Sequence, residues 1–419
     1  MYHPMTRASL NLTRACNLRC SYCFTRGCTH GRMSDDTAFK IVNFLFANAE
    51  MCKQPRDRAV EISFWGGEPL LEWNLLQRIT LYAEDVSRRL AIPVTFTGTT
   101  NGTLLTPEKF DFLDAHRTFF LVSFDGTKET HDYYRKMVNG QGSHDLIEKN
   151  LKIILQRWPF YQTRMGPFPE RIDHFFEDCK YTYDLGIRHL IFSPVYEGNW
   201  TDEKWAIFED QAMQLVDFIA EKQKEGITLT VEHFKQYTRI DDSKWPCGAG
   251  RFYVGFDIDG AIYPCHRFNK FDDTRPWQEK EVCIGHVDHG ITRPEFRDQF
   301  IDFKPQCGGC PRLKDTPCHG GCYAVNWDFN KDIMKPHEGV CRYVQMQQRV
   351  SAYYKEKVMD KDMQEASCMP YHGLDGSSCK CFNANYTGAA QPPISDEVIA
   401  LLLQDLNRRV AALEAKVNG

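Results

Sequence analysis

Short apolar runs alternate with longer stretches of helical period over the first ~200 residues of the chain. The short runs are rich in β-branched residues or alternate between apolar and polar positions, and both patterns are typical of strands. They predict strands at residues 9–13, 59–65, 93–100, 118–124, 160–165 and 188–195. Because helical stretches separate these strands, the pattern predicts a parallel sheet with helical crossovers, either open or barrel-like.

Several of the predicted helices have a clear beginning. Ser34 precedes a helix with two aspartates in its first turn, and Ser143 precedes another, so both serines are expected to be N-caps. The expected apolar face of the second helix consists of Leu146, Ile147, Asn150, Leu151 and Ile154. An amphipathic helix near 202–224 ends the alternating pattern.

The later part of the chain has a different character. Residues 245–345 are rich in Cys, Gly, Pro and aromatic residues and poor in helical period, so we expect a second domain held together by something other than a large core. Near the C-terminal end, a linker-like stretch precedes a short heptad pattern, which predicts a helix that docks on the body or forms a dimer seam. The expected domains are 1–225, 226–350, 351–387 and 388–419.

Composition narrows the class of protein. The chain has 419 residues and a formal net charge of −5, with no long basic run, so neither nucleic acid nor an anionic membrane is an expected partner. The first 15 residues lack the apolar core of a signal peptide, and no stretch approaches the ~18 apolar residues of a membrane span. We therefore expect a cytoplasmic protein, in which 17 cysteines favour metal ligation or redox chemistry over disulfides.

Cys16, Cys20 and Cys23 fall within eight residues and have no fourth cysteine at ligand spacing beside them. Three thiolates can hold three irons of a 4Fe–4S cluster and leave the fourth iron open for a ligand, whereas electron-transfer clusters normally have four cysteine ligands. A zinc site that lacks one ligand, or three unrelated thiols, would show the same spacing.

The sequence CNLRCSYC, residues 16–23, resembles the signature of radical S-adenosylmethionine (SAM) enzymes, and FWGGEP, residues 64–69, resembles their second signature. The resemblance implies that the open iron of a catalytic cluster binds SAM and that an electron cleaves SAM to methionine and a 5′-deoxyadenosyl radical. The protein positions the cofactor and shields the radical from water. The implied fold is α/β: a partial (β/α)6 TIM barrel, a small cysteine-rich domain and a C-terminal helix.

The second signature contains candidate SAM-binding residues. Gly66 and Gly67 end a predicted strand, where glycine lets the backbone approach a ligand closely. Glu68, followed by Pro69, would accept a hydrogen bond from the SAM ammonium together with exposed carbonyls. A glycine turn with a capping glutamate is the alternative interpretation.

Two further segments, TTNGTLL at 99–105 and VSFDGTKETHDYYR at 122–135, resemble strand ends of the same family. The first contains Asn101, a further candidate for SAM binding. By resemblance, Ser123 would bond the SAM ribose, Arg135 would pair with the SAM carboxylate, and the Tyr22 ring would lie near adenine. A strand-end turn or a surface arginine would be the ordinary alternative.

Seven more cysteines lie at residues 247, 265, 307, 310, 318, 322 and 341. Their short spacings alone would also fit zinc, but the arrangement resembles the SPASM domain, which carries auxiliary clusters in radical SAM proteins. GAIYPC supplies the expected glycine and cysteine, Gly260 and Cys265. The resemblance implies two auxiliary 4Fe–4S clusters, the first held by Cys247, Cys265 and Cys322 and the second by Cys307, Cys310, Cys318 and Cys341.

The spacing and number of these cysteines differ from the SPASM pattern in two places. The gap from Cys310 to Cys318 has seven residues where five is usual, so we expect an inserted loop. Relatives with a closed first cluster have another cysteine between the positions of Cys247 and Cys265, and this chain has none. Either an iron is open to a thiolate, heteroatom or water, or a fourth ligand comes from elsewhere. The available thiols are Cys283, Cys368, Cys379 and Cys381, whereas Cys28, Cys52 and Cys179 are expected to be buried thiols.

His266 follows Cys265 at the position where sulfatase-maturating relatives carry an aspartate proposed as a general base. An imidazole could serve as that base, and a histidine that donates a hydrogen bond to the cluster is an equal alternative. Residues 366–388 could cover the clusters, bind another metal or mimic a cysteine-containing substrate.

These features predict a radical SAM enzyme that oxidatively modifies a ribosomally made peptide or protein, by a thioether or another crosslink. Formylglycine formation in a sulfatase and dehydrogenation of a small molecule are the alternatives. A low-potential donor of the flavodoxin or ferredoxin type is the expected electron source. A non-catalytic iron–sulfur carrier is the hypothesis from another class, and it would need no FWGGEP segment.

Overall fold

The computed structural model describes residues 4–25, 30–54, 58–159, 161–235, 247–271, 274–301, 306–307, 318 and 320–359. Residues 1–365 form one compact unit. The predicted segment 366–388, the linker and the terminal helix lie outside the described residues, as do Cys28 and Cys310. None of the described helices is long and apolar enough to cross a membrane.

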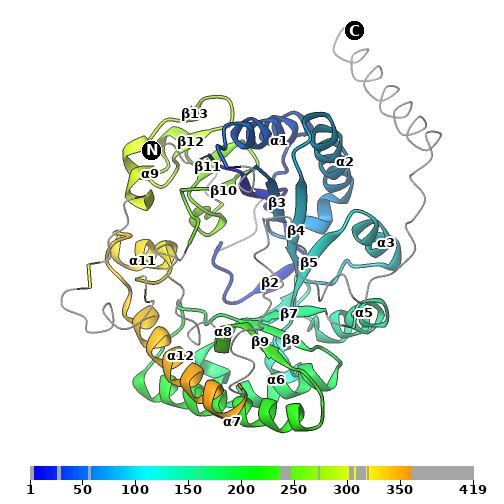
Figure 1. Ribbon diagram of the computed structural model, residues 1–419, viewed down its shortest axis with the longest axis vertical. Helices are drawn as coiled ribbons and strands as arrows, with labels where there is room; N and C mark the ends of the chain where they lie inside the picture. The colour runs from blue at the N-terminus through cyan, green and yellow to red at the C-terminus, as the bar shows by residue number, and fades with distance from the viewer. Residues whose placement is uncertain are drawn as a thin grey trace. The chain divides into compact units, whose positions relative to one another are not determined.

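The six predicted strands are all present, and each pairs in parallel with the next. They are β1 (Arg7–Asn11), β3 (Val60–Trp65), β4 (Val94–Thr100), β5 (Thr118–Ser123), β7 (Gln162–Met165) and β8 (His189–Phe192). A short strand, β9 (Thr230–Val231), continues the parallel pairing beyond β8. The predicted α/β fold with a partial barrel is thereby confirmed, and Figure 1 looks along this barrel.

Helices follow the strands, and most of the longer ones form the outer layer in Figure 1. They are α1 (Asp35–Glu50), α2 (Trp73–Leu90), α3 (Pro107–Ala115), α4 (Lys128–Tyr134), α5 (His144–Arg157), α6 (Phe175–Asp184), α7 (Asp202–Lys224) and the single turn α8 (Glu232–Lys235). The Ser34 side chain accepts a hydrogen bond from the Thr37 amide at 3.0 Å, which confirms the first predicted N-cap. The predicted bounds of the 202–224 helix are those of α7.

Two details of α5 differ from the prediction. Ser143 occupies the N-cap position, but its hydroxyl makes no capping hydrogen bond, because a different partner holds it, as described below. Leu146 is 39% exposed, whereas Ile147, Leu151 and Ile154 are buried. The buried stripe includes His144 in place of Leu146, so it is rotated relative to the predicted one.

The cysteine-rich region continues the barrel sheet. The strand β10 (Tyr253–Phe256) pairs in parallel with β1, and an antiparallel ribbon follows from β11 (Ala261–Tyr263) through β12 (Gly285–His286) to β13 (Gly290–Ile291). Val254, Phe256 and Ile262 are fully buried in the same hydrophobic cluster as the barrel core. This part of the region is therefore not held by cysteines alone, because β10 satisfies the hydrogen-bonding edge of β1 and shares its core.

Three helices complete the described residues of this region: α9 (Pro294–Ile301), α11 (Tyr323–Asn330) and α12 (Glu338–Lys357). The sequence did not predict α12, which crosses the expected boundary at residue 350. It packs along α7, as Figure 1 shows, with Arg349 bound to Glu209 at 2.5 Å and the Tyr353 hydroxyl donating to Asp217 at 2.8 Å.

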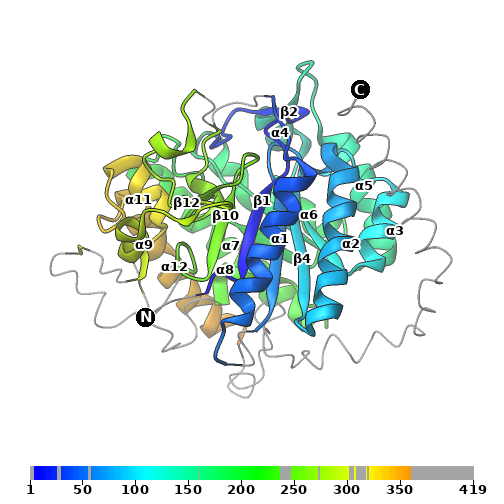
Figure 2. The same cartoon turned by 90° about the horizontal axis from the view of Figure 1, so that it is seen from above.

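A separate two-stranded sheet lies at one end of the barrel. The strand β2 (Leu18–Cys20) pairs antiparallel with β6 (Arg135–Met137), and Cys20 is opposite Arg135 in the register. Figure 2 shows β2 and α4 at the same end of the structure. This pairing brings the first cysteine motif to the segment that follows β5, more than a hundred residues later in the chain.

Candidate active site

The three N-terminal cysteines lie on the loop and short strand that follow β1. The Cys16 sulfur accepts hydrogen bonds from the Leu18 amide at 3.4 Å and from the Asn101 side-chain amide at 3.8 Å. The Cys23 thiol lies 3.0 Å from the Thr25 hydroxyl. Such N–H donors stabilise thiolate sulfur, and hydrogen bonds to the sulfurs tune iron–sulfur clusters. The donor set therefore fits an iron–sulfur cluster held by Cys16, Cys20 and Cys23.

Gly66 and Gly67 lie very close to another part of the backbone of this chain, residues 13–15. The Gly67 amide donates to the Thr13 carbonyl at 2.8 Å. A Cβ on Gly67 would lie 2.1 Å from the Ala15 carbonyl oxygen, and a Cβ on Gly66, which has φ of +149°, would lie 2.4 Å from the Thr13 carbonyl oxygen. The two glycines thus hold the start of the cysteine loop against the end of β3.

Glu68 is fully buried, and its carboxylate is surrounded by donors from its own and the next strand end. One oxygen accepts from the Leu70 amide at 3.0 Å and the Thr100 hydroxyl at 2.7 Å, and the other accepts from the Asn101 amide at 2.7 Å. Burial nevertheless raises the pKa of Glu68. The geometry matches the capping alternative, with Pro69 buried in the turn that follows: Glu68 ties β3 to β4.

Asn101 joins the end of β4 to the cysteine loop. Besides its contact with Cys16, its side-chain amide donates to Oδ1 of Asn17 at 2.8 Å. Its own Oδ1 accepts from the Thr103 backbone amide at 3.0 Å. Asn101 therefore has a supporting role toward Cys16 that the sequence motif did not reveal.

Asp125 organises Tyr22 and Arg135, and the sequence analysis missed it. Its Oδ2 accepts from the Tyr22 hydroxyl and from Arg135 Nε, both at 2.6 Å, and its Oδ1 accepts from the Gly166 amide at 2.9 Å. Burial alone would raise the pKa of Asp125, but the Arg135 guanidinium holds it below its usual value. Arg135, expected to face the SAM carboxylate, already has one carboxylate partner. Ser123, at the end of β5, is 8% exposed.

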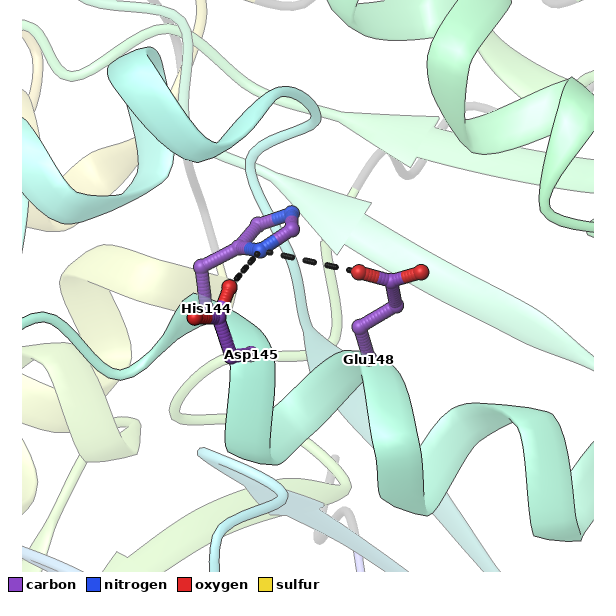
Figure 3. A group of neighbouring side chains, drawn as sticks. All are labelled: His144, Asp145 and Glu148. Carbon is purple, nitrogen blue, oxygen red and sulfur yellow. Dashed lines mark hydrogen bonds and ion pairs between the residues drawn. The ribbon is translucent and has the colours of Figure 1, made fainter.

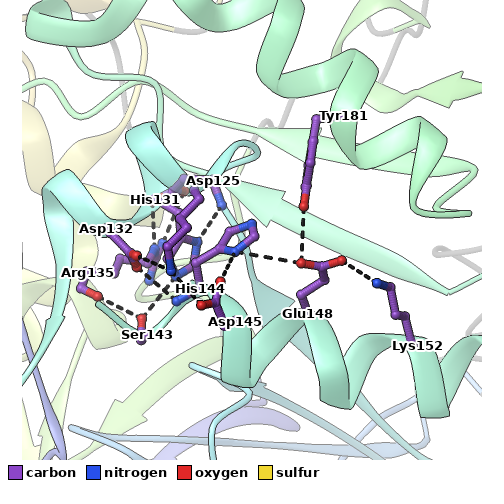
Figure 4. Close-up of polar contacts among 11 residues, drawn as sticks. Asp125, His131, Asp132, Arg135, Ser143, His144, Asp145, Glu148, Lys152 and Tyr181 are labelled. Atoms are coloured by element: carbon purple, nitrogen blue, oxygen red, sulfur yellow. Dashed lines mark hydrogen bonds and ion pairs between the residues drawn. The ribbon is translucent and has the colours of Figure 1, made fainter. Parts of the chain in front are cut away.

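A chain of hydrogen bonds, drawn in Figure 4, holds Asp125 and Arg135 in place. The Asp125 amide donates to His131 Nδ1 at 3.2 Å, His131 Nε2 lies 3.1 Å from the Ser143 hydroxyl, and that hydroxyl donates to the Arg135 carbonyl at 2.7 Å. Because a backbone amide can only donate, Nδ1 must accept and Nε2 carries the proton. Burial lowers the pKa of His131 to about 3, so the ring is neutral near pH 7.

A buried ion pair anchors the start of the cysteine loop to the cysteine-rich region. Asp257, immediately after β10, accepts from Arg14 Nη2 at 2.5 Å and from the Asn11 side-chain amide at 2.8 Å. Its carboxylate is fully buried, and Lys280 Nζ lies 3.8 Å away. Charges buried this deeply are retained only with partners. No motif marked Asp257, since its partner lies more than two hundred residues away in the sequence.

Cys247, Cys265 and Cys322, the first predicted auxiliary set, lie within electrostatic range of one another. Burial raises the pKa of Cys265, and the charges of Cys247 and Cys322 raise it further. Burial also raises the pKa of Cys247 to about 11, with a smaller contribution from Cys322. The amides of Arg267 and Phe268 donate to the Cys265 sulfur. Three neighbouring thiols with amide donors form a suitable soft-ligand site for iron.

Cys283 is not part of this group. It is 2% exposed, and its thiol donates to the Gly285 carbonyl at 3.2 Å. Cys179 is fully buried against Met165, as expected, and the half-buried Cys52 donates to the Asn48 carbonyl. The second auxiliary set stays a prediction, because Cys310 lies outside the described residues. Of the rest of that set, Cys307 and Cys318 are half-buried, and Cys341 lies in the first turn of α12.

His266 lies between the two cysteine groups. Its Nδ1 is 2.7 Å from the Tyr253 hydroxyl, and its ring centroid is 5.3 Å from that of Trp65 and 6.2 Å from that of Phe24. Burial lowers the pKa of His266 to about 3, and the charges of Arg164 and nearby cations add to this effect. The residue after Cys23 and the residue after Cys265 are thus neighbours in space.

A group outside this site also has metal-ligand chemistry. Figure 3 shows His144, Asp145 and Glu148 at the start of α5, with their ligand atoms within 4.8 Å of one another. Lys128 already pairs with Asp145 at 2.7 Å, and Lys152 with Glu148 at 2.5 Å. These residues therefore form an ion-pair network on the helix, part of which appears in Figure 4.

Comparison with known proteins identifies the barrel. The description "Radical SAM superfamily" belongs to a family model that matches residues 10–181. The chain carries a radical SAM domain. A cysteine-type anaerobic sulfatase-maturating enzyme from Clostridium novyi (strain NT) is 24% identical over 325 residues, which are 73% of this chain and 84% of that enzyme.

Two solved structures share the radical SAM fold of this chain. The sulfatase-maturating enzyme anSMEcpe with bound SAM and the Cp18Cys peptide has a TM-score of 0.65 at 18% identity, over 84% of this chain and 96% of that one. SuiB from Streptococcus suis, bound to its precursor peptide SuiA, has a TM-score of 0.56 at 15% identity, over 81% and 76% of the two chains. The predicted resemblance to radical SAM enzymes is confirmed for residues 10–181, and that superfamily implies a 4Fe–4S cluster and SAM.

Proposed function

We propose that this radical SAM enzyme oxidatively modifies a ribosomally made peptide or protein and forms a thioether or another crosslink. When bound, the cluster and SAM supply a 5′-deoxyadenosyl radical that abstracts a substrate hydrogen. Cys16, Cys20 and Cys23 would hold the cluster, and the Tyr22–Asp125–Arg135 group would line the SAM site beside β5. The peptide complexes of anSMEcpe and SuiB support a peptide as the substrate class.

One observation supports a role for the auxiliary cysteines in addition to the radical SAM reaction itself. The ring of Phe24, next to Cys23, lies 6.2 Å from the ring of His266, next to Cys265. A substrate held at this junction would be near both cysteine groups. An auxiliary cluster on Cys247, Cys265 and Cys322 could then accept the second electron of a net oxidation or hold a substrate sulfur.

Cys283 was one candidate for the fourth ligand of the first auxiliary cluster. Its thiol is bonded to the Gly285 carbonyl within the core. Among the described residues, this favours a site with three cysteine ligands and a position open to a substrate thiolate. A thioether crosslink makes direct use of such a position, so we favour it among the possible bonds.

The test uses anaerobically reconstituted protein, SAM and a low-potential reductant. Release of 5′-deoxyadenosine checks the radical SAM reaction, and mass spectrometry of added peptides checks the modification. Loss of two hydrogens per bond from cysteine-rich precursor peptides encoded beside the gene would support crosslinking. Conversion of a peptide with C/S-x-P-x-R to formylglycine would replace the proposal with sulfatase maturation. Reaction of neither peptide class would contradict it.

A further inference from the structure

Arg164 projects into the barrel from β7. Its neighbours along the strand, Thr163 and Met165, are 0% and 3% exposed, and Met165 contacts Cys179 of α6, so Arg164 points to the opposite face, away from α6. It is opposite Ser123 of β5 and Ile191 of β8 in the register. The side chain is accessible to water.

The position of Arg164 is central to the candidate active site. Its charge acts on His266, and it experiences the charges of Tyr22, Arg135 and Asp125. It therefore lies within electrostatic range of both the proposed SAM site and the residue that follows Cys265. A group of the substrate that reaches this place would lie beside the reacting atoms.

Three cations near Arg164 have acidic partners. Arg135 is bound to Asp125, Arg267 to Glu197, and Lys270 to Asp328 at 2.8 Å. Among the described residues, the Arg164 guanidinium has no hydrogen bond or ion pair, and Arg267 and Arg135 repel it. An accessible guanidinium without an acidic partner among these residues is suited to an anionic ligand.

We infer that Arg164 binds a carboxylate of the peptide substrate and selects peptides with an acidic residue beside the modified position. The planar guanidinium offers two parallel donors, which match a carboxylate. The inference rests on the proposed peptide substrate. The other source of a carboxylate at this place is SAM itself, and the experiment separates the two sources.

The binding experiment compares short synthetic peptides that contain a central cysteine and differ only in Glu or Gln beside it. Fluorescence anisotropy measures their affinities for the reconstituted protein with SAM. We expect the wild type to bind the Glu peptides about tenfold more tightly, as for a charged hydrogen bond. Arg164→Gln should lose this preference, and Arg164→Lys should keep part of it. The control is Arg88→Gln, on the exposed face of α2, which should keep all of it.

Equilibrium dialysis of SAM against the same variants gives the second arm. A preference for Glu peptides that disappears only in the Arg164 variants supports the inference. No preference in the wild type, or the same preference in Arg164→Gln, overturns it. A loss of SAM affinity in Arg164→Gln with unchanged peptide preference assigns the carboxylate to SAM and also overturns it. Failure of the proposed function would appear separately, as absence of 5′-deoxyadenosine or of peptide modification.

Discussion

The Nε–H of Arg135 donates to Oδ2 of Asp125 at 2.6 Å, in a position where both side chains are buried. The Tyr22 hydroxyl shares the same carboxylate oxygen. Asp125 thus sets the positions of Tyr22, in the first cysteine motif, and of Arg135, in its own segment 122–135. The predictions below begin with this pair.

Asp125→Asn should destabilise the protein strongly. The substitution leaves the buried Arg135 guanidinium without a charged partner, which costs about 3–5 kcal/mol in comparable cases. Urea unfolding should report this loss, and equilibrium dialysis should show weaker SAM binding. Asp85→Asn is the control, because Asp85 pairs with arginines only on the exposed face of α2. Equal effects of the two substitutions would contradict the assigned role of Asp125.

Glu68→Gln tests whether the carboxylate has a structural role. The amide group of glutamine would face one of the three donors held by Glu68, so unfolding should become easier by about 1–3 kcal/mol. If Glu68 only ties β3 to β4, the SAM affinity of the folded variant should change little. The matched control is Glu72→Gln, whose contact with Arg32 is long at 3.8 Å. A large loss of SAM affinity without loss of stability would instead indicate that Glu68 binds the SAM ammonium.

Asp178 should make stability depend on pH. Burial raises its pKa from 3.8 to about 7 in the folded state. Between these values the unfolded state holds fewer protons than the folded state, so stability falls as pH rises through this window. Asp178→Asn removes this titration, so from pH 4 to pH 7 the stability of the variant relative to the wild type should rise by an amount on the order of 4 kcal/mol. Urea unfolding across the pH range checks this, and parallel curves for the two proteins would contradict it.

The auxiliary cysteines can be tested by iron content. Cys322→Ala should lose roughly four irons per chain after anaerobic reconstitution, since one 4Fe–4S cluster would lose a ligand. Cys283→Ala is the control, because that thiol is buried and bonded to Gly285. Iron analysis and absorption spectra measure the difference. The same iron content in Cys322→Ala and wild type would exclude Cys322 as a required ligand.

Much of the barrel could be predicted from the sequence. The six strands and α7 follow from local periodicity, since each element buries one face and shows that face in its own residues. The helix α12 escaped prediction because Gln347 and Ser351 interrupt its apolar stripe. The alternation of Arg164 with buried neighbours on β7 was visible, but a weak four-residue strand gave no reason to single it out.

The sequence by itself determined the cysteine spacing, the glycine pair and the order of strands, because these depend on residues near one another in the chain. Only the tertiary structure showed that Asp125 holds Arg135, that the Glu68 carboxylate accepts three hydrogen bonds, and that Asp257 anchors Arg14. The contacts of Glu68 with Thr100 and Asn101 and of Asp257 with Arg14 join segments that are distant in sequence, and Asp125 meets Arg135 only through the fold of the short segment between them. Such partners become known only when the sheet register brings strand ends together.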